Sequence, residues 1–130
     1  MAWSFSSDKP VYLQVAERIR RSVITGEYAA GEQIPSVRAL ALSAAVNPNT
    51  VQHAFTELED EGIIESRGTL GRFVTEDIAK LELARGRLAK DIVRDFVYRT
   101  SDLDISRDTL IEMIDVELEL LVKGESDERT

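Results

Sequence analysis

The tetrapeptide Asn47-Pro48-Asn49-Thr50 is the feature that most limits how this chain can fold. Asparagine is a preferred helix N-cap, because its side chain accepts a hydrogen bond from an otherwise unpaired N–H of the first turn. Proline at the next position costs little, since the N–H it lacks has no partner inside the helix. Apolar residues then recur at the spacing of one helical face, and a glycine follows the last turn. The face consists of Val51, Ala54, Phe55 and Leu58, and the glycine is Gly62.

Segments on either side of this helix complete a recognisable unit. Residues 36–44 predict a second short helix with Val37, Leu40 and Ala41 inward, joined to the first by the tight connection 45–47. Two short helices joined in this way form a helix-turn-helix, whose second helix enters the major groove of DNA. Downstream, residues 63–67 and 72–75 are strand-like runs around a glycine-containing segment, which predicts a β-hairpin wing. The predicted fold class is mainly α with a small β-hairpin wing.

Polar residues at the start of the second helix are candidates for reading DNA bases. Asn49 and Gln52 have no structural task visible in the sequence, and both side chains can bind an adenine edge through two hydrogen bonds. Asn47 is explained by capping alone, although a cap residue can also touch a phosphate. His53 is neutral or partly charged near pH 7, so a contact to a phosphate or base is one of two open interpretations. The DNA-binding candidates are Arg38, Asn47, Asn49, Thr50, Gln52, His53, Arg67, Gly71 and Arg72.

Several short motifs at fixed spacing accompany this unit. They are Pro10-Val11-Tyr12-Leu13-Gln14-Val15, Gly26-Glu27, Gly31, Pro35-Ser36-Val37-Arg38 and Asn47-Pro48-Asn49-Thr50-Val51. With these motifs, residues 9–74 resemble the winged helix-turn-helix of GntR-type bacterial transcription regulators, and specifically the short YtrA subfamily. The resemblance implies that Arg38 contacts DNA, as the matching arginine of the family does. The alternative is a structural role for Arg38, in which it binds carboxylates or caps carbonyls.

Two positions depart from the pattern of the family. His53 stands where YtrA-type proteins often have arginine. Wings of the family typically end Gly-x-Gly-Thr-Phe-Val, whereas residues 68–74 here have one more residue between the glycines and Arg72 in place of threonine. Arg67 and Arg72 flank the tip, where either can enter a minor groove or hold a phosphate. Leu70 is expected to be exposed at the tip, and the sequence does not assign it a role.

The C-terminal third predicts two more helices. Residues 76–99 form one long helix, residues 100–105 a break, and Ser106 caps a further helix that ends at Gly124. We divide the chain into a winged helix-turn-helix domain (1–75), a helical dimerisation region (76–124) and a disordered tail (125–130). Two helices joined by a short loop cannot bury both apolar faces alone, so they pack on the winged domain or, as the YtrA resemblance implies, on a second subunit. The dimerisation candidates are Leu88, Ile92, Phe96, Leu110, Ile114, Leu118 and Leu121.

Charge and composition exclude several classes of function. The net charge of −8 opposes the basic footprint of a DNA-binding domain, but it is uneven. Residues 1–75 hold 7 Lys+Arg against 9 Asp+Glu, and residues 76–130 hold 9 against 15. The chain has no cysteine and 1 histidine, which argues against a metal site. We find no catalytic constellation, cofactor motif, signal peptide or membrane-length apolar run, and therefore expect a cytoplasmic protein that is not an enzyme.

Together these features predict a dimeric, sequence-specific transcriptional regulator. We expect a repressor that binds an inverted-repeat operator in double-stranded DNA, because a twofold dimer presents two recognition helices to successive major grooves. The alternative is a winged-helix adaptor that binds proteins, which the acidic balance supports. A small-molecule effector of unknown identity is a further hypothesis, with Trp3, Phe5 or Phe96 lining a cavity between the winged domain and the hairpin.

Overall fold

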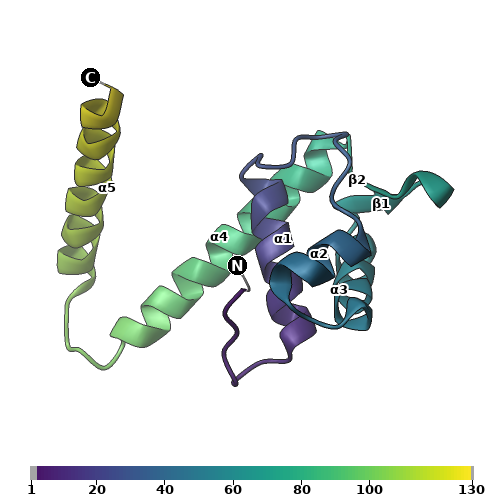
Figure 1. The fold of residues 1–130 in the computed structure, drawn as a ribbon. Coiled ribbons are helices and arrows are strands. Elements are labelled where there is room, and N and C mark those ends of the chain that lie inside the picture. Colours follow the sequence, from purple (N-terminus) through teal and green to yellow (C-terminus); the bar gives the residue numbers. More distant parts are fainter. Residues whose placement is uncertain (1–2, 130) are drawn as a thin grey trace. The chain divides into compact units, whose positions relative to one another are not determined.

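The structure is a computed structural model that describes residues 3–129, and Figure 1 shows the order of its elements. By its internal contacts the chain separates after Ala89 into two parts, called here the winged-helix unit and the C-terminal unit. The prediction of a mainly helical fold with a small hairpin wing is confirmed. None of the helices within the described range is long and apolar enough to span a membrane. The elements are α1 (Val11–Ile24), α2 (Val37–Ala44), α3 (Pro48–Asp60), β1 (Ile64–Ser66), β2 (Arg72–Val74), α4 (Ile78–Thr100) and α5 (Arg107–Arg129).

The core of the winged-helix unit forms where α1, α2 and α3 meet the base of the wing. The predicted stripe of α3 is completely buried, with Phe55 and Leu58 each 0% exposed. Burying each such side chain removes apolar surface from water and contributes about 1.5–3 kcal/mol. The remaining core comes from every other element of the unit. It includes Val15, Ala16, Ile19, Val23, Ile34, Leu40, Ala41, Ile63, Ile64, Val74, Leu81 and Ala84.

Local hydrogen bonds fix the starts of α2 and α3, and the cap at Asn47 is the one that the sequence predicts. The Asn47 side chain accepts a hydrogen bond from the backbone N–H of Asn49 at 2.8 Å, with Pro48 as the first helical residue. The hydroxyl of Ser36 likewise accepts from the N–H of Ala39 at 3.1 Å and caps α2. Between the helices, Ala45 takes a left-handed conformation with φ of 58°, which turns the chain within three residues. The helix-turn-helix is therefore set by contacts close in sequence.

The wing is supported by the loop between α1 and α2. Strands β1 and β2 pair antiparallel, with Ile64 opposite Val74. On the other edge of β2, the N–H of Ile34 donates to the carbonyl of Arg72 at 2.9 Å, and the N–H of Val74 donates to Glu32 at 2.8 Å. These bonds give β2 a partner on both sides, and they join the wing to the loop leading into α2.

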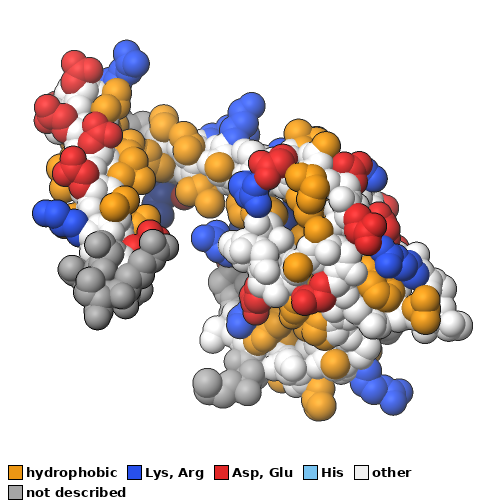
Figure 2. Space-filling view, turned by 90° about the horizontal axis from the view of Figure 1, so that it is seen from above, with side chains coloured by type: hydrophobic (Ala, Val, Ile, Leu, Met, Phe, Trp, Pro, Cys, Tyr) orange, Lys and Arg blue, Asp and Glu red, His pale blue; other side chains and the backbone are white. Residues whose placement is uncertain are grey.

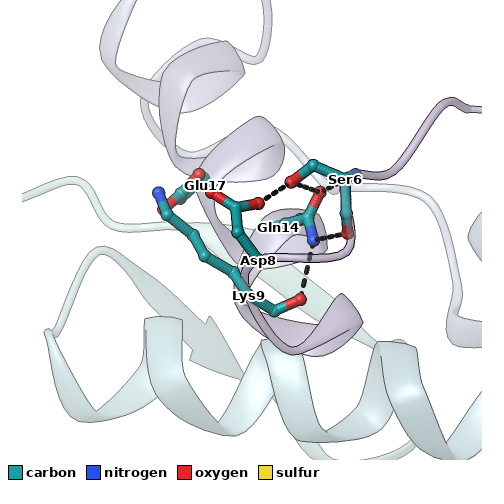
Figure 3. A network of polar contacts seen from close by, with 5 residues as sticks. All are labelled: Ser6, Asp8, Lys9, Gln14 and Glu17. Atoms are coloured by element: carbon teal, nitrogen blue, oxygen red, sulfur yellow. Dashed lines mark hydrogen bonds and ion pairs between the residues drawn. The ribbon is translucent and has the colours of Figure 1, made fainter.

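An N-terminal arm precedes α1 and is held to its first turns by side-chain hydrogen bonds (Figure 3). The amide of Gln14 donates to the carbonyls of Ser6 and Lys9, each at 2.9 Å, and accepts from the Ser6 N–H. Lys9 also pairs with Glu17 at 3.0 Å. Trp3 and Phe5 pack against the core as half-buried side chains.

Helix α4 belongs to both units. Its first half is part of the winged-helix unit, since Leu81 and Ala84 are buried and Leu88 packs on the core. The first unit therefore reaches beyond the domain boundary predicted at residue 75. Between residues 91 and 125 almost every side chain is exposed, and Figure 2 shows hydrophobic side chains gathered along α5 and the end of α4.

The start of α5 follows the prediction, but its end does not. The hydroxyl of Ser106 accepts a hydrogen bond from the N–H of Thr109 at 3.2 Å, which caps the helix as expected. Helix α5 then continues through Gly124 to Arg129, so the predicted stop at Gly124 is wrong. The backbone of residues 125–129 is helical where we predicted a disordered tail, and Thr130 lies outside the described residues. A glycine inside an exposed helix costs only about 1 kcal/mol relative to alanine, which is too little to end it alone.

Candidate nucleic-acid interface

The first turn of α3 presents polar side chains to solvent. Asn49 and Gln52 are exposed, and their side chains form no hydrogen bond with any described residue. Asn47 is exposed as well, but its oxygen is occupied by the cap bond. Thr50 is half-buried. Free amide groups at the start of a groove-sized helix are available for bidentate contacts to base edges.

Arg38 lies at the second position of α2 and is exposed. In the described part of the chain its guanidinium forms no ion pair and no hydrogen bond. No contact therefore supports the structural role considered for Arg38. Arginine is charged at any physiological pH and its planar fork matches a phosphate or a guanine edge. Arg38 is thus a free cation on the first helix of the helix-turn-helix.

His53 is engaged within the protein. Its ring stacks on Tyr12 of α1, with ring centroids 3.5 Å apart and an angle of 7° between the planes. Sequence analysis did not find this pair, because the two residues stand on separate helices and Tyr12 reads as one more inward residue of α1. The stack gives His53 a structural role, in joining α3 to α1, alongside the DNA contact that stays a prediction.

The wing arginines are also engaged. The Nε of Arg72 donates to Glu59 Oε1 at 2.6 Å, and its guanidinium carbon lies 4.8 Å from the centroid of the buried Phe55 ring. The guanidinium of Arg67 lies 4.3 Å from the Phe73 ring centroid, with one nitrogen 3.7 Å from Glu65. The sequence prediction did not include the partners of either arginine. Arg72 pairs with a residue of another element, whereas Glu65 and Phe73 lie within six residues of Arg67.

Gln33 holds the tip of the wing. Its side-chain amide donates to the carbonyl of Leu70 at 2.5 Å, across a short 3₁₀ turn formed by residues 68–70. Gly71 has φ of +105°, and a Cβ atom there would lie 2.9 Å from Gln33 Nε2. Only glycine fits both demands. Leu70 itself is 68% exposed, so the tip presents an apolar side chain.

Acidic side chains at the far end of α3 bind arginines from other elements. Glu61 receives two hydrogen bonds from Arg20 of α1, at 2.8 and 2.6 Å. Glu59 receives Arg72 of the wing, as described above. The negative charge of this end is therefore partly neutralised within the fold. The beginning of α3 carries no acidic residue in its first turn, so the helix divides into a neutral polar half and an acidic half.

Comparison with known proteins identifies the family. Residues 11–74 match the family model of bacterial regulatory proteins, gntR family. Over 110 residues the chain is 34% identical to YhcF of Bacillus subtilis, an uncharacterized HTH-type transcriptional regulator, covering 85% of this chain and 91% of YhcF. The chain belongs to the GntR family. This GntR protein is also 39% identical, over 82 residues, to the HTH-type transcriptional repressor YtrA of Bacillus subtilis, which covers 63% of this chain and 62% of YtrA.

A solved structure supports the same assignment over most of the chain. A GntR family transcriptional regulator from Listeria monocytogenes matches this GntR chain with a TM-score of 0.80 at 35% identity, covering 85% of this chain and 97% of that one. The predicted family and the winged-helix architecture are confirmed. The protein is an HTH-type transcriptional regulator, and its family consists of regulators rather than enzymes.

Proposed function

We propose that this GntR protein is a dimeric repressor that recognises an inverted-repeat operator through the start of α3. The observation that supports base recognition most directly is the exposed, unbonded side chains of Asn49 and Gln52, next to a helix that carries the free Arg38. Amide side chains give sequence readout and arginine gives phosphate or guanine binding. The relative YtrA is named a transcriptional repressor, which favours repression.

The apolar surface of the C-terminal unit supports the dimer. Phe96, Ile114 and Leu118 are 38%, 41% and 55% exposed although they are the residues expected to be buried between subunits. They line a groove of about 710 Å³ together with Leu110 and Leu121. Contiguous apolar surface of this kind marks an interaction site, and a symmetric dimer would cover it in both copies. Leu88 differs from the other dimerisation candidates, because it packs on the core of the winged-helix unit.

The test begins with selection of bound sequences from random double-stranded DNA, which returns the operator and its half-site spacing. Asn49→Ala and Arg38→Ala are each expected to weaken operator binding by about 1–3 kcal/mol, measured by fluorescence anisotropy. Arg21→Ala is the matched control for Arg38→Ala, because Arg21 is also exposed, lies on α1 and is not a candidate. Operator binding equal to that of the parent in both candidate variants would show that the site lies elsewhere.

The second candidate function is a winged-helix adaptor that binds a protein. The net charge of −8 favours it, since phosphate binding requires cations. Salt separates the two functions: affinity for DNA falls steeply as salt rises, whereas association with a protein partner through apolar contacts does not. A polar first turn on α3 has no use in such an adaptor, which is why we place it second.

Two of the aromatic residues named for an effector, Trp3 and Phe96, line different cavities. Trp3 borders a cavity of about 300 Å³ inside the winged-helix unit, with Arg18 stacked 4.2 Å from its ring centroid. Phe96 borders the groove of the C-terminal unit. An effector in the first cavity would quench or shift the fluorescence of Trp3, the single tryptophan, and raise the unfolding temperature. If candidate ligands cause neither change, none of them binds in the first cavity.

A further inference from the structure

We propose that Tyr12 is a positioning residue for DNA binding, because it holds the imidazole of His53 in the orientation from which its N–H edge binds a backbone phosphate. The inference rests on the proposed DNA-binding function and adds a residue of α1 that is not among the DNA-binding candidates. A consequence is that operator affinity depends on pH, since the phosphate contact is strongest when the imidazole carries a positive charge.

The first support is the geometry of the stack. The ring centroids of Tyr12 and His53 are 3.5 Å apart, and the two planes are nearly parallel, with 7° between them. Tyr12 is half-buried at the start of α1, a helix that packs against α3. An exposed histidine has several side-chain rotamers available, and contact with the tyrosine ring selects one of them. Less side-chain freedom is then lost when the imidazole binds DNA.

The second support is the face of α3 on which His53 lies. Asn49, Gln52 and His53 follow one another at the spacing of one helical face, opposite the buried stripe of the helix. All three are exposed. His53 stands one turn beyond Asn49, beside α1, whereas base edges are met by the first residues of a recognition helix. We accordingly assign His53 to the phosphate backbone that borders the groove rather than to a base.

The third support is that the stack and a phosphate contact use different parts of the imidazole. Tyr12 covers one face of the ring, whereas the N–H donors of a histidine lie in the ring plane. Within the described structure, neither ring nitrogen of His53 forms a hydrogen bond or an ion pair. His53 can therefore bind a phosphate without leaving Tyr12, and the stack is kept in the complex with DNA.

The titratable groups around the stack make the contact measurable through pH. His53 is the single histidine of the chain, and histidine is the side chain that ordinarily changes charge between pH 5 and 8. The charged residues at helical spacing from the two rings are Glu57 on α3, and Asp8 and Lys9 before α1. Asp8 and Lys9 have partners in the arm and in α1 (Figure 3). Phenols, carboxylates and lysine amines ordinarily titrate outside pH 6–8, so a change in DNA affinity across this range reports on the imidazole.

The test measures dissociation constants of the full chain for a selected operator duplex at pH 6 and pH 8, each between 50 and 200 mM salt. Tyr12→Leu removes the aromatic face, Tyr12→Phe keeps it, and His53→Gln removes the imidazole but no other titratable group. Tyr28→Leu is the matched control, because Tyr28 is a half-buried tyrosine of the same unit that forms no ring stack in the described structure. Thermal unfolding followed by circular dichroism gives the folded fraction of each variant at both pH values.

The parent is expected to bind the operator about three- to tenfold more tightly at pH 6 than at pH 8, with a salt slope steeper by about 0.9, the value for one added phosphate contact. Affinity rises as pH falls because a phosphate binds the protonated imidazole more strongly than the neutral one. His53→Gln loses this gain. Tyr12→Leu stays within about twofold of the parent at pH 8, and its gain at pH 6 falls below about twofold. Tyr12→Phe and Tyr28→Leu keep the gain of the parent.

A second measurement requires no variant. The single histidine gives its own imidazole signals in proton NMR, and the ring current of Tyr12 shifts them upfield while the rings are stacked. The upfield shift is expected to persist when the operator duplex is added at pH 6. Its disappearance would show that the stack opens on DNA, which overturns the positioning role of Tyr12.

Two further results would overturn the inference while leaving the proposed function intact. One is a pH dependence that is absent in the parent or unchanged in His53→Gln, which excludes the phosphate contact of His53. The other is a Tyr12→Leu variant that keeps the full gain, or that binds more weakly by the same factor at pH 6 and pH 8, which limits Tyr12 to a structural role. A parent protein that binds the operator and a scrambled duplex equally would overturn the proposed function, and this inference with it.

Discussion

The winged-helix unit and the C-terminal unit have similar hydrophobic patterns and opposite states of burial. In α3 the apolar stripe is 0% exposed throughout, whereas in α5 Leu118 and Leu121 are 55% and 62% exposed. Both helices are amphipathic by sequence. Periodicity therefore says which face of a helix is apolar, but it does not say whether the partner of that face lies in the same chain.

This difference has a thermodynamic consequence. Burial in the winged-helix unit stabilises a single chain and does not depend on its concentration. If a second chain covers the C-terminal unit, as we propose, its stability includes a free energy of association and rises with concentration. The stability loss caused by a substitution should therefore depend on protein concentration in the C-terminal unit but not in the winged-helix unit. Four predictions test this difference, from the largest expected effect to the smallest.

Phe55→Ala gives the largest effect. Phe55 is 0% exposed and lies in the centre of the core, so its truncation leaves a cavity and costs about 3–5 kcal/mol. Chemical unfolding followed by circular dichroism measures the loss, and it should be the same at micromolar and at tenfold higher protein concentration. Leu121→Ala is the comparison, since its stability loss should grow with concentration. A concentration-dependent loss in Phe55→Ala would show that the two units do not unfold independently.

Leu118→Glu addresses the exposed region. It places a charge in the apolar groove and should convert the protein from dimer to monomer in sedimentation experiments. Operator affinity should fall by about a hundredfold, because one recognition helix then binds without the other. Val116→Glu is the matched control, since Val116 is 53% exposed on the same helix but does not line the groove. If the unsubstituted protein is monomeric at all concentrations, the proposed dimer is wrong.

Features that depend on neighbouring residues were predictable from sequence. The caps at Asn47 and Ser106, the buried stripe of α3 and the hairpin around Gly68 and Gly71 each follow from contacts within a few residues. Local chemistry favours one structure at these positions, and the fold agrees with it. The family resemblance added the overall arrangement, which periodicity alone does not supply.

Features that depend on pairs from distant elements were not predictable. Tyr12 with His53, Arg72 with Glu59 and Gln33 with Leu70 join elements far apart in sequence. Each residue fits its own helix or strand equally well without the partner, so no local pattern identifies the pair. The same holds for the DNA contacts of α3, which depend on a molecule absent from the fold and stay predictions.

The helix caps allow a matched test of both regions at a smaller scale. Asn47→Ala and Ser106→Ala each remove one side-chain acceptor from a first helical turn, at a cost of about 1 kcal/mol. Differential scanning calorimetry should find the Asn47→Ala loss at every protein concentration. The Ser106→Ala loss should appear mainly in the association equilibrium. Similar concentration dependence in the two variants would argue that α5 is stabilised within one chain.

The smallest effect concerns the pH dependence of the winged-helix unit. Burial raises the pKa of Tyr28, and the carboxylates of Glu27 and Glu32 raise it further. The folded chain therefore holds this proton more tightly than the unfolded chain, in which the phenol ionises near its usual value of about 10. The contribution of Tyr28 to stability is fully present below that value and is lost as pH rises through the folded pKa.

Urea unfolding of the parent between pH 8 and 11 should show a decline in the free energy of unfolding above about pH 10 that Tyr28→Phe reduces. Tyr98→Phe is the matched control, because it removes the same hydroxyl from a side chain of the C-terminal unit that is 79% exposed. The difference between the two variants gives the combined contribution of burial and of the two neighbouring carboxylates at Tyr28. Equal pH profiles for Tyr28→Phe and the parent would mean that Tyr28 is as accessible to water as an unfolded tyrosine.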